Sequence, residues 1–121
     1  MGFYKCEICG NIVGLIKNGG GQLVCCGKNM NIIKANSTDA SLEKHVPVLA
    51  KENERVVVKV GSTLHPMINE HYIEWIAVSN NDGIEIVFLS PMDEPKAEFC
   101  DKEYNEVYAY CNLHGLWKKD L

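Results

Sequence analysis

Six cysteines and four histidines are the residues of this 121-residue chain whose types and spacing could do chemistry. Four of the cysteines fall within the first 26 residues, whereas Cys100 and Cys111 lie near the end. The histidines all follow the first cysteine cluster: His45, His65, His71 and His114. This segregation predicts two separate sites. Because the chain begins without an apolar secretory signal, the cysteines favour metal or redox chemistry over disulfides.

The first cluster is a Cys6-x-x-Cys9 pair followed by the adjacent Cys25 and Cys26. A glycine comes directly after each pair, and glycine there lets backbone N–H groups turn toward the sulfurs. Four thiolates around one ion indicate tetrahedral zinc or iron, which the ligand set alone does not separate. A structural zinc ribbon, a disulfide pair and a CxxC redox motif are the alternative interpretations.

The second set combines imidazoles with one thiol. The segment 111–114 has C-x-x-H spacing, which can place a thiolate and an imidazole on one metal, and His65 and His71 flank a loop closed by Pro66. Such a mixed set suits a redox-active transition metal better than Ca²⁺ or Mg²⁺. Blue copper competes, but no methionine follows Cys111 as an axial ligand. Four imidazoles in a plane with an axial thiolate would leave one position open, as catalysis requires.

Short strands must position these residues. Segments rich in β-branched and aromatic residues predict strands at 55–60, 72–79, 84–89 and 104–111, with turn signals between them and no long amphipathic helix. We therefore predict a mainly β chain. Residues 1–36 form a small domain that needs a metal, 35–41 read as a linker, and 37–121 form an antiparallel, immunoglobulin-like sandwich. Trp75, Trp117 and the tyrosines are expected in its core.

Composition excludes other classes of protein. Hydrophobic residues make up 46% and charged residues 23% of the chain, as in an ordinary globular protein. The net charge of −4 argues against nucleic-acid binding. No apolar run approaches the roughly 18 residues that span a bilayer. We expect a cytoplasmic protein without membrane or nucleic-acid partners.

These motifs resemble the two modules of the desulfoferrodoxin family of superoxide reductases. Residues 6–10 with 25–27 are similar to the desulforedoxin module, whose rubredoxin-type iron centre uses an adjacent cysteine pair. Residues 43–47, 65–75 and 111–117 resemble the catalytic neelaredoxin domain. The resemblance covers essentially the whole chain, and it moves the preference at the first site from zinc to iron, with zinc still possible there.

The resemblance implies one-electron reduction of superoxide to hydrogen peroxide at a ferrous site with an open sixth position. This activity would protect an anaerobic or microaerophilic prokaryote from oxidative stress. The implied ligands are four equatorial histidines and one axial cysteine: His45, His65, His71, His114 and Cys111. One histidine of such sites binds through Nδ1, and we expect it to be His114, which shares a short turn with Cys111. A second iron would bind Cys6, Cys9, Cys25 and Cys26.

Two residues beside His45 complete the expected site. Lys44 would supply local positive charge that attracts superoxide, and by resemblance Glu43 would occupy the sixth position once iron is ferric. Backbone N–H groups of Leu113 and His114 are expected to bind the cysteine sulfur. Cys100 is not expected to be a ligand.

The resemblance also implies rubredoxin or a similar protein as the electron donor and a homodimer as the assembly. Two functions of other classes stay open at this point. One is a non-catalytic iron electron carrier, and the other is a zinc-stabilised binding module.

Overall fold

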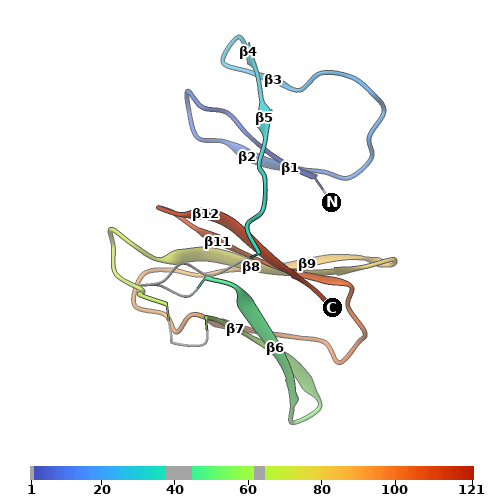
Figure 1. Cartoon of the computed structure of the whole chain (residues 1–121), viewed down its shortest axis with the longest axis vertical. Helices are drawn as coiled ribbons and strands as arrows, with labels where there is room; N and C mark the ends of the chain where they lie inside the picture. The colour runs from blue at the N-terminus through green and yellow to red at the C-terminus, as the bar shows by residue number, and fades with distance from the viewer. Residues whose placement is uncertain (1, 38–44, 62–64) are drawn as a thin grey trace. The chain divides into compact units, whose positions relative to one another are not determined.

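The computed structural model describes residues 2–37, 45–61 and 65–121, so Glu43 and Lys44 lie outside the described residues (Figure 1). The chain divides into two compact units, Met1–Lys34 and Ala35–Leu121. Regular structure in the described ranges consists of strands without a helix, which confirms the mainly β prediction. Accordingly, the described residues contain no helix that could span a membrane.

The first unit is built from very short strands. β1 (Gly2–Lys5) lies between β2 (Ile12–Leu15) and β5 (Asn31–Ile32), and β3 (Val24–Cys25) pairs with β4 (Lys28–Asn29). Phe3 and Cys6 are its buried hydrophobic residues within the described part. So small a core cannot by itself offset the conformational entropy of about 34 ordered residues, which is why a unit of this size needs a metal or a partner.

The second unit is a sandwich of two antiparallel sheets. One sheet has the order β10-β7-β6 and the other the order β12-β11-β8-β9. The bounds of these strands are β6 (Pro47–Glu52), β7 (Arg55–Val60), β8 (Ile73–Asn80), β9 (Gly83–Phe88), β10 (Lys96–Phe99), β11 (Glu106–Cys111) and β12 (Gly115–Asp120). β6 pairs with β7, and β7 pairs with β10. This three-plus-four arrangement is the immunoglobulin-like architecture expected from the sequence.

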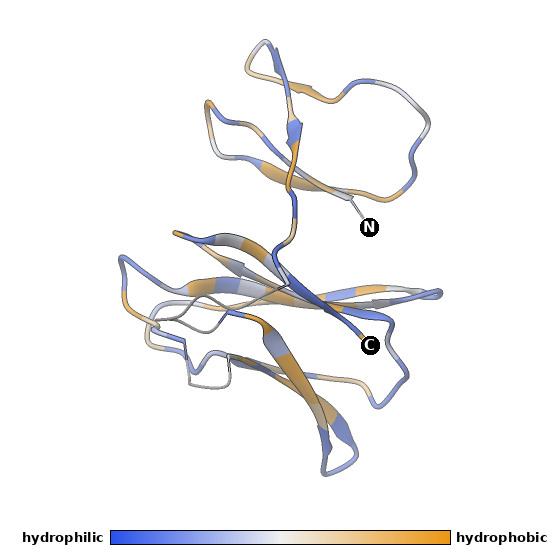
Figure 2. Ribbon diagram, viewed as in Figure 1, coloured by the Kyte–Doolittle hydropathy of each residue, from blue (hydrophilic) through white to orange (hydrophobic). Residues whose placement is uncertain are grey.

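Alternating side chains fill the space between the sheets. From β7, Val56, Val58 and Val60 are fully buried, while Ile76 and Cys111 face them from the other sheet. Figure 2 shows hydrophobic residues along the β6–β7 hairpin and hydrophilic residues at its turn. Period-two alternation is what places one side of each strand in the core. Cys111 is the last residue of β11, and its side chain lies in the core just before the chain turns toward β12.

The strand predictions over 55–60, 72–79 and 84–89 match β7, β8 and β9 within one residue at each end. The predicted strand 104–111 begins two residues before β11. β6, β10 and β12 were not predicted, because each is short or carries several charged residues. They are strands because a neighbouring strand satisfies their backbone, and the residues of the segment itself do not reveal that neighbour.

Of the predicted linker 35–41, the structure describes residues 35–37, and Asn36 pairs with the sandwich. Asn36 N donates to the Leu116 carbonyl at 2.9 Å, and Lys118 N donates to the Asn36 carbonyl at 2.9 Å. These bonds form a parallel bridge opposite Trp117. The chain thus enters the second unit alongside β12, at the level of this tryptophan.

Tyr104 closes the connection between β10 and β11. Its hydroxyl lies 2.6 Å from Oε2 of Glu85 and 2.9 Å from the Cys100 carbonyl oxygen, and it donates to these acceptors. Burial raises the pKa of the Tyr104 hydroxyl, and the bond to Glu85 raises it further. Tyr104 precedes β11, which is the sixth strand of the sandwich, and its hydroxyl hydrogen-bonds a backbone carbonyl four residues upstream. This arrangement is the tyrosine corner of immunoglobulin-like sandwiches.

Replacing Tyr104 with Phe should therefore lower the free energy of unfolding by about 1–2 kcal/mol, because the acceptors lose their buried donor. Urea unfolding followed by tryptophan fluorescence measures this, since both tryptophans, Trp75 and Trp117, lie in the second unit. Tyr72→Phe, at a half-buried tyrosine of the same unit, is the control and should cost less than about 0.5 kcal/mol. Equal losses in the two variants would contradict a special role for the corner.

Candidate metal centres

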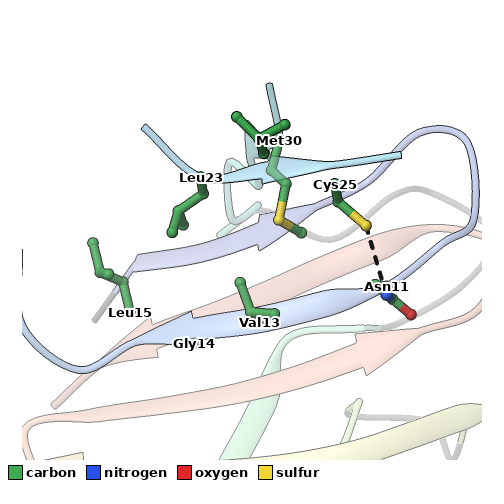
Figure 3. A pocket seen from close by; sticks show the side chains of 8 residues that line it. Asn11, Val13, Gly14, Leu15, Leu23, Cys25 and Met30 are labelled. Carbon is green, nitrogen blue, oxygen red and sulfur yellow. Dashed lines mark hydrogen bonds between the residues drawn. The ribbon is translucent and has the colours of Figure 1, made fainter. Parts of the chain in front are cut away.

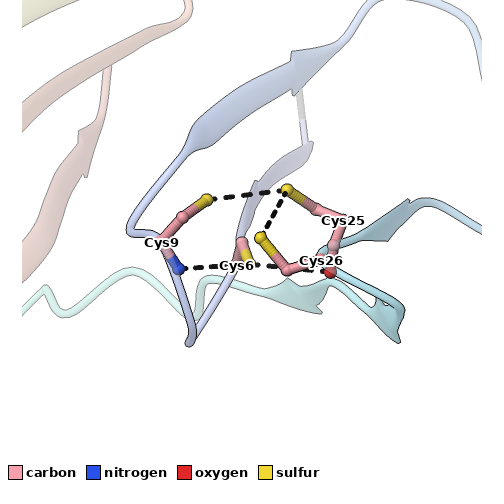
Figure 4. A group of neighbouring side chains, drawn as sticks. All are labelled: Cys6, Cys9, Cys25 and Cys26. Carbon is pink, nitrogen blue, oxygen red and sulfur yellow. Dashed lines mark hydrogen bonds between the residues drawn. The ribbon is translucent and has the colours of Figure 1, made fainter.

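Four thiols of the first unit converge on one point (Figure 4). Cys6 and Cys9 lie in the turn after β1, and Cys25 and Cys26 lie at the end of β3. Cys25 Sγ is 3.6 Å from Cys9 Sγ and 3.9 Å from Cys26 Sγ. In a tetrahedral zinc site with bonds of about 2.3 Å, the sulfurs lie about 3.8 Å apart. The four thiols fit a single tetrahedral ion, and these separations are too long for a disulfide.

Donors from the backbone and one amide surround these sulfurs. Cys9 N donates to Cys6 Sγ at 3.5 Å, and Asn11 Nδ2 donates to Cys25 Sγ at 3.7 Å. Gly10 has a φ of 81°, a left-handed conformation that closes the turn around the first pair. Such donors stabilise negative charge on metal-bound sulfur.

Ionisation of the cluster depends on a cation. Hydrogen bonding from the Cys9 backbone lowers the pKa of the Cys6 thiol to about 7. Hydrogen bonds to the thiols of Cys9 and Cys25 raise the pKa of Cys26 to about 12. One thiolate forms readily and its presence opposes the next, so all four ionise together only when a cation compensates their charge.

The second unit gathers four imidazoles and one thiol. The ligating atoms of His45, His71, Cys111 and His114 lie within 4.8 Å of one another. The His65 ring joins them, because its centroid is 4.6 Å from those of both His45 and His71. His45 precedes β6, and the loop between β7 and β8 carries His65 and His71. Cys111 ends β11, and His114 lies in the turn that follows. Three separate segments thus meet at one end of the sandwich.

Distances within this group are those of neighbouring metal ligands. His114 Nδ1 is 3.1 Å from His45 Nε2 and 3.8 Å from Cys111 Sγ. Two ring nitrogens at about 2.1 Å from one ion, at right angles, would lie about 3.0 Å apart. His65 Nδ1 lies 2.7 Å from the Pro66 carbonyl, so its proton sits there and Nε2 presents the lone pair. The donor set fits a transition metal with mixed nitrogen and sulfur ligands.

Burial makes most of this group costly without a cation, although His114 is exposed. His45 is 1% exposed, His65 3% and Cys111 0%. Polar donors held in a dry site need hydrogen-bond or metal partners to offset lost hydration. The sheet register also serves the site, because a bulge between β8 and β11 at Tyr110 and Cys111 re-aims the end of the strand.

Asn112 joins two of the ligand-bearing segments, and the sequence interpretation did not single it out. Its Oδ1 accepts from Tyr72 N at 2.9 Å, its Nδ2 donates to the Glu70 carbonyl at 3.0 Å, and its N donates to the Tyr72 carbonyl at 3.2 Å. These bonds bracket His71. Its place inside the C-x-x-H turn was the available signal. Cys100 is exposed and belongs to neither metal-ligating group of the described residues.

Comparison with known proteins identifies a family that matches both parts of the chain. Residues 1–33 match the family model of the desulfoferrodoxin N-terminal domain, and residues 37–120 match that of desulfoferrodoxin. The chain belongs to the desulfoferrodoxin family. This confirms the resemblance predicted from the motifs. A desulfoferrodoxin homolog of Archaeoglobus fulgidus is 50% identical over 119 residues, which cover 98% of this chain and 95% of the relative.

Proteins named superoxide reductase also match this desulfoferrodoxin-family chain. The crystal structure of the superoxide reductase from Treponema pallidum superimposes with a TM-score of 0.81 at 30% identity, covering 98% of this chain and 97% of that one. The superoxide reductase of Pyrococcus abyssi is 38% identical over 105 residues, covering 70% of this chain and 91% of the relative. The family therefore places two metal sites in the chain, in agreement with the two groups of ligating atoms.

Replacing Asn112 with Ala should weaken metal binding by the second group about 10- to 100-fold, because outer-shell hydrogen bonds orient the ligands. Competition with a coloured chelator measures the affinity. Asn105→Ala is the matched control, since Asn105 also lies near an end of β11, but its side-chain amide donates to Oδ1 of Asn81, at 3.4 Å, away from the ligands. An unchanged affinity in the Asn112 variant would show that the loops hold His71 without this side chain.

Proposed function

We propose that this chain is a superoxide reductase, which converts superoxide, one electron and two protons into hydrogen peroxide at the second group. The observation that carries the proposal is one buried thiol gathered with four imidazoles at the end of a sandwich, in a desulfoferrodoxin-family chain. The superoxide reductases among the related proteins support it.

We assign iron to both groups. The catalytic iron would bind His45, His65, His71, His114 and Cys111, and the other iron would bind Cys6, Cys9, Cys25 and Cys26, where zinc is the alternative. A ferrous ion with an open coordination position supplies the single electron of the reaction. Five protein donors are one fewer than an octahedral ion accepts, and this supports an open position for a small anion.

The chain itself prepares that site. Packing and the Pro66 bond hold the buried imidazoles, so little reorganisation accompanies electron transfer. The fully buried Cys111 sulfur is shielded from water, which strengthens its electrostatic effect on a bound cation. Donation from Leu113 N and His114 N to that sulfur stays a prediction.

Lys44 and Glu43 keep the roles expected from the sequence. Each lies within two positions of the buried His45, so both belong to the segment that leads into the site. Because the whole chain carries a net charge of −4, attraction for an anion must come from such a local cation. We propose that Lys44 attracts superoxide and that Glu43 closes the site when iron is ferric.

A direct assay tests the function. The iron-loaded chain, reduced beforehand, should consume pulsed superoxide and form one hydrogen peroxide per superoxide without evolving oxygen. Oxygen evolution would indicate a dismutase instead. No superoxide consumption, with both metals bound, would leave a non-catalytic electron carrier, and a colourless zinc protein would leave a binding module.

Lys44→Ala should slow the second-order reaction with superoxide by up to about tenfold at low salt and flatten its dependence on ionic strength. Stopped-flow or pulse-radiolysis kinetics measure both effects. Lys51→Ala is the control, since Lys51 is an exposed lysine bound to Glu103 at 3.1 Å and to Asp101 at 3.6 Å. If the Lys44 variant keeps the rate and the salt slope of the parent, the lysine does not steer the substrate.

Cys6→Ser should abolish the first metal centre and leave the reaction of the pre-reduced second centre with superoxide within about twofold. The reason is that the two groups belong to separate compact units. Metal analysis and single-turnover kinetics provide the measurement. Complete loss of superoxide reduction with the second centre still loaded would mean that the first centre is an obligatory relay.

We further propose a homodimer, with an apolar groove of the first unit as support. The groove has a volume of about 380 Å³ and lies beside one metal-binding thiol (Figure 3). Its lining residues are Asn11, Val13, Gly14, Leu15, Leu23, Val24, Cys25 and Met30. β2 is also an edge strand of its sheet, so it offers backbone groups to a partner. Light scattering of the loaded chain measures the mass that decides this.

The redox chemistry supports a choice of electron donor, and the cysteines support a choice of compartment. Each turnover oxidises the site by one electron, so we propose rubredoxin or a similar small carrier as the donor. Five of the six cysteines lie in the two metal-ligating groups and not in disulfides, which supports a reducing compartment, the cytoplasm.

A further inference from the structure

We propose that Trp117 is a positioning residue that sets the placement of His45 relative to His114. The inference deepens the proposed function, because it concerns the same site. By its sequence this tryptophan is expected in the core of the sandwich. The structure assigns it contacts to two of the four gathered histidines, made through different parts of its indole.

The first contact is a stack. The indole of Trp117 lies parallel to the His45 imidazole, with ring centroids 4.6 Å apart and an interplanar angle of 13°. Both side chains are buried, with exposed fractions of 6% for the indole residue and 1% for the histidine. A rotation of the imidazole about its Cβ–Cγ bond would break this stack inside a packed core. The indole therefore restricts the plane of the His45 ring and so the direction of its Nε2 lone pair.

The second contact is a hydrogen bond. Trp117 Nε1 donates to the His114 carbonyl oxygen at 3.1 Å. This bond holds the backbone of the turn that carries the His114 ring. The two imidazoles face each other edge to face, at 4.8 Å between centroids and 79° between planes. Their ligating nitrogens lie 3.1 Å apart, so one indole supports both members of this nitrogen pair.

Trp117 is itself held on both edges of its strand. On one side it pairs with Ala109 of β11. On the other side, the backbone of Asn36 bonds the residues before and after it. Because its backbone is held on both sides, the indole of Trp117 can fix the position of the imidazole that it contacts. We infer that replacing it will alter the geometry of the bound metal, beyond any general loss of stability.

Two variants separate the contacts. Trp117→Phe keeps an aromatic ring beside His45 but lacks the N–H donor, whereas Trp117→Leu lacks both. Trp75 supplies the matched control, since it is equally buried, at 8% exposed, and stacks on Tyr110 at 5.6 Å and 6°. Trp75→Leu thus removes a comparable stacked indole whose stacking partner is not a histidine.

The experiment loads the full chain of each variant with Co²⁺ and follows the visible spectrum. Trp117→Leu should lower Co²⁺ affinity at the histidine-containing group about tenfold or more and shift its cobalt bands. Trp117→Phe should lower the affinity by about threefold and give a smaller shift. The bands of the four-cysteine group serve as an internal reference and should stay unchanged in every variant. Trp75→Leu should lower the thermal midpoint but leave affinity and bands unaltered.

Two results would overturn the proposal. One is wild-type affinity and bands in both Trp117 variants. The other is an equal loss in Trp75→Leu, which would reduce the effect to general destabilisation. If Trp117→Leu does not fold, the comparison of Trp117→Phe with wild type still decides. The readout is metal geometry, so it stands apart from whether the iron-loaded chain reduces superoxide.

Discussion

The rest of the catalytic unit depends on one constraint, the crowding of metal-ligating atoms at one end of the sandwich. His45 Nε2 and His114 Nδ1 lie 3.1 Å apart, with the fully buried Cys111 sulfur 3.8 Å from the second of them. His114 is exposed, but His45 and Cys111 are buried, and their ligating atoms have no water to replace a cation between them. The sandwich must therefore hold in place an arrangement that is favourable only with metal, and most features around the site serve this end.

The strands of the sandwich and a few side-chain contacts keep the ligands in place. The ligands come from strand ends and turns, which by themselves would be the least fixed parts of a β-sandwich. Asn112 hydrogen-bonds the backbone on both sides of His71, and Trp117 supports two further ligands. The Asn112 bonds and the stack of Trp117 on His45 join segments that are distant in the chain, whereas the bond from Trp117 to the His114 carbonyl closes the local turn. A site assembled in this way can stay open on one side without losing its geometry.

The first unit solves the opposite problem. Its described residues bury little besides Phe3 and Cys6, so the metal stands in for a hydrophobic core. The Cys9 backbone lowers the pKa of Cys6, while hydrogen bonds with the thiols of Cys9 and Cys25 raise the pKa of Cys26, so the fourth thiol resists ionisation. One chain thus uses metal in two ways, as the core of one domain and as the reactive centre of the other.

Sequence alone determined the ligand types, their division into two groups and the β class. These follow from local features, namely C-x-x-C and C-x-x-H spacing, β-branched runs and turn residues, which carry their meaning within a few positions. Only the tertiary structure decided that β6, β10 and β12 are strands, that Asn36 pairs beside Trp117, and that Asn112 and Trp117 restrain the ligands. Most of those features, such as the Asn36 bonds to β12 and the Asn112 bond to Tyr72, rest on contacts between residues far apart in the chain. No local pattern encodes which distant partner a side chain will meet.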